Sequence, residues 1–381
     1  MANNTLGNFT EYLLEEKVGI LIWKIFPPVM IVLGTVGNSL SIIVLTRKSI
    51  RSSTTAVYLT VLAFSDLIVL YAGLLRQWII YLFDVDIRKL TEFGCKINIW
   101  LVYSSLHFSA WILIVLTMER VISAWLPHKA RTLCKRKSAI ALVNCLGVFI
   151  LGLNSHMLYG MVFKYSFDDD GNLQYAKCVE IDENYDVFFN KTWPWIDFCA
   201  FCFIPFSVIL IGNALILIKV LASRRKVISQ VVPIRKDGRD HLAGRKTKQA
   251  SMPVLLFTLN IVYLLSTSPV SIYNIGYTFW IKNANQQETA VLDLWLAVVN
   301  IFMYVNNSLN FFLYCLSGTK FRREVRRIIC VWRQGKGIRS KQGAVNYDNT
   351  RRTLTARSPK HSIFTTRNSQ IQHQSNMRES N

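Results

Sequence analysis

Residues 108–121 have the sequence FSAWILIVLTMERV, in which a mostly apolar run ends in an acid and a base. The run belongs to the segment Gly94–Ala124, which exceeds the roughly 20 residues that a helix needs to cross a bilayer. The adjacent charges, Glu119 and Arg120, fall where such a helix would meet water. There the arginine can be held by its neighbour or released, because an exposed ion pair contributes little stability.

Six further segments share this length and apolar character. They are Gly19–Thr46, Ala56–Leu82, Ser138–Phe163, Pro194–Leu221, Ala250–Trp280 and Ala290–Cys315. Of the 381 residues 51% are hydrophobic and 18% charged, and the apolar residues are concentrated in these runs. A buried helix of a soluble protein could mimic one such run but not seven in series. The pattern therefore predicts an all-α membrane protein, a seven-transmembrane helix bundle.

The net charge of +21 would suit a nucleic-acid partner, but its distribution favours a membrane. Basic residues gather in the loops after the first, third and fifth segments and in the tail: Arg47, Lys48, Arg51, Lys135, Arg136, Lys137, Arg224, Arg225, Lys226, Lys320, Arg322, Arg323, Arg326 and Arg327. Positive loops stay in the cytoplasm. We therefore expect a multi-pass protein of the plasma membrane with an extracellular N-terminus, a cytoplasmic C-terminus and no nucleic-acid partner.

Four regions follow from this topology. Residues 1–18 form an extracellular N-terminal tail, and residues 19–316 form the seven-helix domain. Residues 317–333 alternate apolar side chains and arginines at helical spacing, which predicts a short amphipathic eighth helix on the lipid of the inner leaflet. Cys330 in this helix is either palmitoylated or an unmodified thiol. Residues 334–381 are polar, rich in Ser and Thr, and expected to be a disordered cytoplasmic tail.

The expected outer side carries three further features. Glycosylation sequons begin at Asn3, Asn8 and Asn190. Cys95 and Cys178 also fall on this side, where disulfides persist. The segment Tyr165–Tyr185 contains Gly171 and Asn172 between stretches with aromatic and aliphatic residues, which favours a β-hairpin.

Polar residues at membrane depth are costly and usually functional. Asp66 is the acid in the middle of a predicted span, and other spans offer Asn38, Ser109, Asn306, Asn307 and Asn310. Lone asparagines in spans commonly serve as hydrogen bonds between helices. A carboxylate grouped with Asn and Ser side chains also suits a cation that prefers oxygen ligands. We expect a sodium site formed by Asp66 with Asn38, Ser109, Asn306 and Asn310.

Catalytic chemistry is not indicated. The histidines and cysteines have no metal-ligand spacing, and no nucleotide-binding glycine loop occurs, so we expect neither an enzyme nor a metalloprotein. A transporter would show inverted repeats and several intramembrane charges, and a channel would show a pore loop or a charge ring. The sequence has none of these patterns.

An ordered set of motifs resembles the class A, rhodopsin-like G-protein-coupled receptors over almost all of Gly19–Trp332. The set comprises Gly37-Asn38, Leu62-Ala63-x-x-Asp66, Glu119-Arg120-Val121, Pro205, Pro269, Asn310-Phe311-Phe312-Leu313-Tyr314 and Phe321. The interval from Cys95 to Arg120 is also usual for that family. The resemblance implies a disulfide between Cys95 and Cys178.

Several positions depart from the family pattern. Phe311 stands where the family has a proline, and Asn213 where it has a tyrosine. Ser266-Thr267-Ser268-Pro269 lacks the usual tryptophan, and so does the fourth segment. These departures resemble divergent invertebrate neuropeptide receptors of the FMRFamide-receptor-like kind.

The resemblance implies a signalling mechanism. An extracellular agonist would enter the outer half of the bundle, and a heterotrimeric G protein would engage Arg120, with Glu119, Asn310 and Tyr314 completing the switch. Arrestin and a receptor kinase would act on the Ser/Thr-rich tail. The usual acid at the base of the sixth helix is missing, since Lys246, Thr247, Lys248 and Gln249 stand there. The resting state should therefore depend mainly on Glu119.

The ligand class is narrowed by elimination. No lysine for retinal lies within Ala290–Cys315, and Val102 occupies the position of the aspartate that aminergic receptors use. Candidate ligand-binding residues in the outer halves are Arg76, Gln77, Asn98, Tyr103, His107, Tyr273, Asn274, Trp295 and Asn300. The acidic stretches Asp168–Asp170 and Glu180–Asp186 would attract a basic peptide. We expect a neuropeptide ligand; the alternative is a chemosensory or small-molecule receptor.

Overall fold

The structure is a computed structural model that describes residues 13–167, 173–230, 239–317, 321–328 and 330. Within these ranges, the structure describes the side-chain environments of all residues except 166–167, 173–176, 224–230, 239–256, 259 and 316–317. The predicted sites at Asn3 and Asn8, and the tail of residues 334–381, lie outside the described residues.

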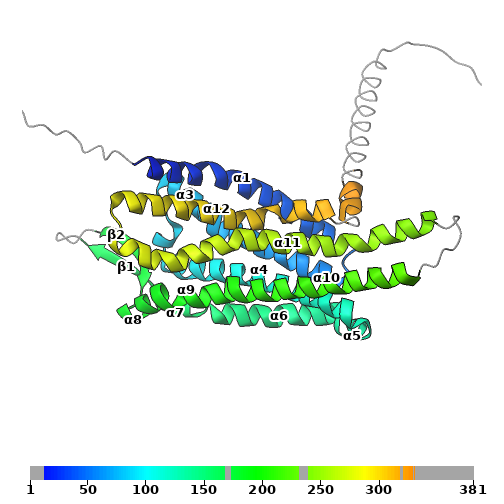
Figure 1. Cartoon of the computed structure of the whole chain (residues 1–381). Coiled ribbons are helices and arrows are strands. Elements are labelled where there is room, and N and C mark those ends of the chain that lie inside the picture. The colour runs from blue at the N-terminus through cyan, green and yellow to red at the C-terminus, as the bar shows by residue number, and fades with distance from the viewer. Residues whose placement is uncertain (1–12, 168–172, 231–238, 318–320, 329, 331–381) are drawn as a thin grey trace, which may run out of the picture. The chain divides into compact units, whose positions relative to one another are not determined.

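Seven long helical segments lie side by side in the described chain (Figure 1), so the predicted all-α seven-helix bundle is confirmed. In chain order they are α1 (Leu14–Leu45); α2 (Thr54–Ile68) with η1 (Val69–Leu74) and α3 (Leu75–Phe83); α4 (Glu92–Trp125); α6 (Arg136–Leu153) with α7 (His156–Gly160); α8 (Glu183–Val187) with η3 (Phe188–Thr192), α9 (Trp193–Asp197), η4 (Phe198–Phe203) and α10 (Ile204–Gln230); α11 (Arg239–Trp280); and α12 (Gln286–Ser317). Short helices η2 (Ile87–Lys89), α5 (Pro127–Leu133) and η6 (Ile281–Asn283) lie in the connections. Among the described residues, six of these segments, all but α11, have the length and apolar composition to cross a membrane.

Most segment ends differ from the prediction by a few residues. The fifth segment ends at Gln230 and not at Leu221, and the sixth begins at Arg239 and not at Ala250. The fourth helix stops at Gly160, and Met161 already belongs to a strand, so the expected end at Phe163 is wrong. The fifth segment begins at Glu183 and not at Pro194. Its extra length follows from a cap, because the Asp182 side chain accepts the Tyr185 N–H at 2.7 Å. Acidic residues in a first turn also interact favourably with the helix dipole.

The predicted β-hairpin is present. β1 (Met161–Phe167) pairs antiparallel with β2 (Leu173–Glu180), and Phe163 lies opposite Cys178. The turn with Gly171 and Asn172 lies outside the described residues. A disulfide joins Cys178 to Cys95 at the start of α4, with the two Cα atoms 5.5 Å apart. The hairpin is therefore covalently fixed to one end of the bundle, which we call the hairpin end.

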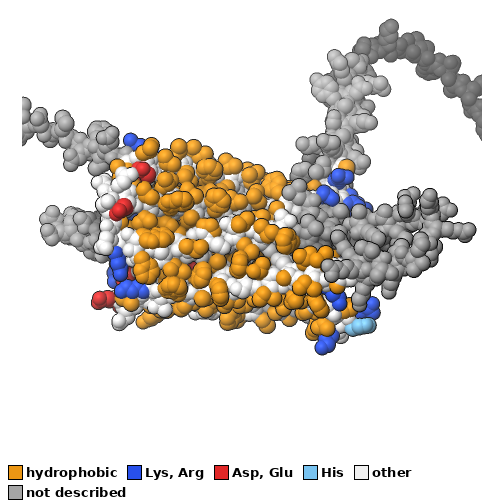
Figure 2. Space-filling model, in the orientation of Figure 1, with side chains coloured by type: hydrophobic (Ala, Val, Ile, Leu, Met, Phe, Trp, Pro, Cys, Tyr) orange, Lys and Arg blue, Asp and Glu red, His pale blue; other side chains and the backbone are white. Residues whose placement is uncertain are grey.

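The surface of the bundle agrees with a lipid environment. Figure 2 shows hydrophobic side chains over the middle of the visible face and charged side chains at its two ends. Large apolar side chains on different helices are exposed, for example Val148 at 73% and Leu265 at 71%. A soluble surface would seldom expose so many, whereas a bilayer requires them.

Close packing of α1 against α12 depends on small residues. A Cβ on Gly37 would lie 2.9 Å from the Cβ of Phe311, so a larger residue would push the helices apart. Asn38 reinforces the contact, since its Nδ2 donates to the Asn307 carbonyl at 2.9 Å. Phe311, which replaces the family proline, also contacts Phe321, with ring centroids 5.8 Å apart.

Pro205 explains a set of contacts between helices. Proline has no N–H, so the carbonyl of Phe201, four residues earlier, lacks its usual helical donor. The Tyr263 hydroxyl of α11 donates to that carbonyl. The neighbouring Ala200 carbonyl, in the π-helical turn η4, accepts Trp111 Nε1 of α4 at 3.0 Å. Backbone groups freed inside a membrane must find such partners, and here they connect three helices.

Residues 321–328 are helical, within the segment predicted as the eighth helix. Phe321 is buried and its ring lies 5.6 Å from that of Tyr314. Glu324 is also buried and lies 4.0 Å from Arg47. Cys330 is exposed.

Removing the disulfide should destabilise the hairpin end. We expect Cys95→Ser or Cys178→Ser to lower the free energy of unfolding by about 2–4 kcal/mol, because the bond restricts the unfolded chain. A thermal unfolding assay of the purified protein measures this. Cys145→Ser, which alters an exposed free cysteine of α6, is the control. Equal melting temperatures for all three variants would contradict the expectation.

Candidate functional site

A buried carboxylate joins two helices in the middle of the bundle. Asp66 of α2 is 0% exposed. Asn307 Nδ2 donates to its Oδ1 at 2.8 Å, and Asn310 Nδ2 donates to its Oδ2 at 2.6 Å. Both donors come from α12, where a spacing of three residues places them on one face.

The other residues predicted for this site lie at different distances from the acid. Ser109 lies beside the Asp66 carboxyl but outside hydrogen-bonding geometry. Asn38 bonds to the α12 backbone. Asn306 is buried, but its neighbour Asn307 makes the contact expected of it. The rotation of α12 in the bundle decides between these neighbours, and sequence spacing does not.

Several oxygens near this centre are buried without a hydrogen-bond partner in the described part of the chain. They are Asn38 Oδ1, Ser109 Oγ and Asn307 Oδ1. Unsatisfied buried acceptors are costly and require explanation. These atoms and the Asp66 carboxylate are oxygen ligands of the kind that a small hard cation prefers.

A second group of polar residues lies at the C-terminal end of α4, away from the hairpin. The Thr54 hydroxyl donates to Glu119 Oε1 at 2.6 Å, while Arg120 Nη2 lies 3.7 Å from the same oxygen. Glu119 is 7% exposed at its side chain and Arg120 23%. The predicted acid–base contact is therefore present but long, and the shorter bond to Glu119 comes from α2. Sequence adjacency could not indicate this partner. Lys246 and Lys248, which stand in place of the usual acid of the sixth helix, lie outside the described side chains.

Tyr314, the last predicted switch residue, is buried beside Phe321. Its hydroxyl has no hydrogen-bond partner among the described residues. Asn310, four residues earlier, is bonded to Asp66. The α12 motif thus links the buried carboxylate to the helix that follows α12.

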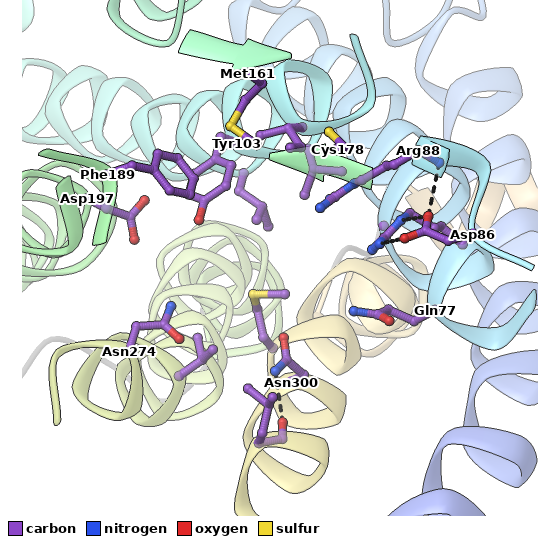
Figure 3. Close-up of a pocket in the computed structure, with 18 of the residues that line it drawn as sticks. Gln77, Asp86, Arg88, Tyr103, Met161, Cys178, Phe189, Asp197, Asn274 and Asn300 are labelled. Atoms are coloured by element: carbon purple, nitrogen blue, oxygen red, sulfur yellow. Dashed lines mark hydrogen bonds and ion pairs between the residues drawn. The ribbon is translucent and has the colours of Figure 1, made fainter. Parts of the chain in front are cut away.

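A cavity of about 580 Å³ opens beneath the hairpin (Figure 3). Every long segment except α6 contributes to its lining, together with η2 and the hairpin. The charged lining residues are Arg76, Asp86, Arg88, Lys89, Lys177, Glu180 and Asp197. The aromatic ones are Trp23, Tyr81, Tyr103, Phe189, Phe201 and Tyr304. An apolar and aromatic wall with a few convergent polar groups is typical of a ligand site.

Five of the nine predicted ligand-binding residues line this cavity: Arg76, Gln77, Tyr103, Asn274 and Asn300. The other four have different positions. Asn98 accepts Arg88 Nε at 2.7 Å, and Tyr273 donates to the Leu292 carbonyl at 2.9 Å. His107 is 0% exposed behind the wall. Trp295 is 56% exposed, so the expectation that it faces the ligand is not supported.

Arg76 lines the cavity as expected, but its charge is not free as expected. We predicted that the Arg76 guanidinium would be available to a carboxylate of the ligand. In the structure it is already paired with the Asp86 carboxylate. Arg76 Nε and Nη2 donate to the two carboxylate oxygens at 2.8 and 2.6 Å. Both side chains are nearly buried, with exposures of 11% and 13%. The bidentate geometry makes this a strong pair.

Sequence reasoning missed Asp86, Arg88 and Asp197 as parts of the site. Asp86 and Arg88 lie in a short connection whose path depends on tertiary packing. Asp197 had a usable signal, since an acid near the end of an apolar span is unusual. Its orientation depends on π-helical turns, because η3 and η4 flank α9. Each such turn inserts a residue and rotates the next part of the chain by about 100° relative to an α-helix.

Comparison with known proteins identifies the family. Residues 37–314 match the family model described as 7 transmembrane receptor (rhodopsin family). The chain therefore belongs to the rhodopsin family of seven-transmembrane receptors, and it is a receptor and not an enzyme.

Individual relatives are distant. The FMRFamide receptor of Drosophila melanogaster is 24% identical over 77% of this chain, and the match spans 51% of that protein, about half its length. Neuromedin-U receptor 2 of Mus musculus is 22% identical over 79% of this chain and 74% of its own length. Oxoeicosanoid receptor 1 of Homo sapiens is 23% identical over 80% and 72%.

The Thr54–Glu119 bond should restrain the resting receptor. We expect Thr54→Val, which removes the hydroxyl donor, and Glu119→Gln, which removes the charge, each to raise agonist-free signalling severalfold. A contact worth about 1 kcal/mol shifts a two-state population roughly fivefold. Signalling in cells at equal surface expression measures this.

Thr60→Val is the matched control, because Thr60 of α2 donates to its own helix at the Ala56 carbonyl. Basal signalling that rises equally in Thr60→Val and Thr54→Val would show that the effect is not specific to Glu119.

Proposed function

We propose that this receptor binds an extracellular neuropeptide in the cavity beneath the hairpin and then activates a heterotrimeric G protein. The observation that carries the proposal is a cavity of about 580 Å³ with charged, amide and aromatic walls at the hairpin end. Such a volume accommodates the end of a peptide, not a whole folded ligand. Two of the relatives are named as FMRFamide and neuromedin-U receptors, and we extend that ligand class to this chain.

We propose that the hairpin end faces the extracellular side of the plasma membrane. The disulfide on this end suits an oxidising compartment. The basic residues in the connections after α1 and α4 and near the end of α10 suit the cytoplasm. Asn190 is exposed in η3, on the same side, and would accept a glycan. The exposed Cys330 would carry a palmitoyl group at the inner leaflet, and arrestin and a receptor kinase would act on the Ser/Thr-rich tail.

The decisive experiment is a screen of amidated peptides on cells that express the receptor, with a calcium or cyclic-nucleotide readout. We expect a response that depends on the receptor and is saturable. A response to small organic ligands alone would favour the alternative, a chemosensory or small-molecule receptor. That alternative draws support from the cavity volume, which also suits a drug-sized molecule, and from the similarity to an oxoeicosanoid receptor.

Arg120→Ala should separate binding from signalling. Arg120 lies far along α4 from the cavity, so we expect agonist binding to change little and G-protein activation to be lost. Radioligand binding and a nucleotide-exchange assay on the same membranes measure the two properties. Undiminished activation by Arg120→Ala would exclude the proposed G-protein contact.

We also propose that Asp66 binds sodium together with Ser109, Asn38 and the α12 amides. The support is the unpartnered buried oxygens beside a carboxylate. A bound sodium ion would neutralise the negative charge of the buried carboxylate. It would stabilise whichever conformational state of the receptor binds it more tightly.

Asp66→Asn should therefore abolish the effect of sodium on agonist affinity. Competition binding in sodium chloride and in choline chloride, at constant ionic strength, measures this. Thr60→Val, which lies away from the acid, should keep the sodium effect of the unmodified receptor. A sodium effect that persists in Asp66→Asn would leave this residue with a structural role only.

A further inference from the structure

Asp197 lines the cavity, and the proposed receptor function does not by itself say what this carboxylate binds. It ends α9, directly before η4, and its side chain is 12% exposed. Figure 3 shows its carboxylate pointing into the cavity, across from Arg88 and Asp86. A carboxylate in this position must be neutralised, paired or available to a ligand.

Its protein partner is a neutral histidine. His107 Nε2 lies 2.9 Å from Asp197 Oδ1, and His107 Nδ1 lies 3.0 Å from Asn154 Nδ2. Asn154 Nδ2 also lies 2.8 Å from the Ile150 carbonyl, which can only accept. That contact fixes the Asn154 amide with its NH₂ toward His107, so Nδ1 must accept and Nε2 must carry the proton. A second proton on Nδ1 would face an N–H donor.

His107 therefore brings no positive charge to the pair. Neutral His107 donates to Asp197 and orients it but does not cancel its charge. His107 and Asn154 are both 0% exposed, so the orienting groups are held rigidly by packing. The cavity wall thus presents a carboxylate that is preorganised and uncompensated.

The opposite wall has the opposite charge. Asp86 accepts both Arg76 donors and the Arg88 N–H at 3.0 Å, so its oxygens are occupied. Burial alone would raise the pKa of Asp86, but these hydrogen bonds and the two guanidinium charges outweigh it and lower the pKa. Burial, with the Arg76 charge, lowers the pKa of Arg88 to about 10, which leaves it cationic at neutral pH. Two arginines and one aspartate carry a net charge of +1.

We propose that Asp197 binds a cationic group of the ligand, a guanidinium or an ammonium, while a carbonyl or carboxylate of the same ligand faces Arg88. The inference rests on the proposed function for the site itself and specifies which ligand chemistry the site selects. The wall with Arg76 and Arg88 repels a cation, which favours this orientation of the ligand over the reverse one. For a peptide, the cation is a basic side chain or a free amino terminus.

Affinity selection on the purified full-length receptor tests this without a known agonist. The probes are amidated tetrapeptide pools in which one position is arginine or its neutral isostere citrulline, each with a free or an acetylated amino terminus. Arginine amide and citrulline amide serve as small probes. Bound compounds are identified by mass spectrometry. The arginine arm tests a basic side chain, and the free-terminus arm tests an ammonium.

We expect cationic probes to be retained roughly tenfold or more over their neutral isosteres, which is the usual strength of a charged hydrogen bond. Asp197→Asn should abolish this preference, and Asp197→Glu should retain part of it. Asp293→Asn, which removes a charge on an exposed residue of α12 outside the cavity lining, should leave the preference unchanged.

Two outcomes would overturn the proposal: an unmodified receptor that does not prefer cations, or an Asp197→Asn receptor that melts normally and keeps the preference. The first needs no variant, so it holds even if Asp197→Asn fails to fold. Cation selection without any peptide-induced signalling would instead count against the proposed peptide-receptor function and leave the role of Asp197 standing.

Discussion

The arrangement of the bundle depends on the hydrogen bonds that the buried Asp66 carboxylate accepts from α12. A charge or acid at membrane depth must be satisfied by protein groups, because lipid offers none. Asn307 and Asn310 satisfy it from α12, and Asn38 ties α1 to the same turn of α12. Three helices are thereby placed in one register. This register sets which face of α12 lines the cavity and which contacts the following helix at Phe321.

Irregular backbone forms part of the cavity wall, since Gly73, Phe189 and Phe201 of the lining lie in π-helical turns. The π-helical turns η1, η3 and η4 and the proline at position 205 interrupt regular helix where two segments approach the hairpin. In a membrane these breaks are tolerated only where side chains satisfy the freed carbonyls, as Tyr263 and Trp111 do. The breaks also rotate the chain, so that Asp197 faces inward. The features that stabilise the bundle and those that form the site are therefore the same.

A single long helix passes all three polar centres. α4 carries His107 near the cavity, Ser109 beside the buried acid, and Glu119 at the far end. A ligand that moves α4 or its partners would change the contacts at each centre. Transmission of a signal requires that the ligand bind one arrangement more tightly than the other, since equal binding would shift no population. The rigid His107–Asn154 support makes the cavity wall a good candidate for such discrimination.

The sequence by itself determined the seven segments, the hairpin and the buried acid, because span length, charge asymmetry and turn residues are local properties. Only the tertiary structure decided that Asn307 and not Asn306 donates to Asp66. The same is true of the ion pair between Arg76 and Asp86 and of the hydrogen bond from Thr54 to Glu119. The first and third of these depend on the rotation of one helix against another, and the second depends on the path of the connection that carries Asp86. A one-residue π insertion changes that rotation without altering the apolar pattern, so periodicity could not reveal it.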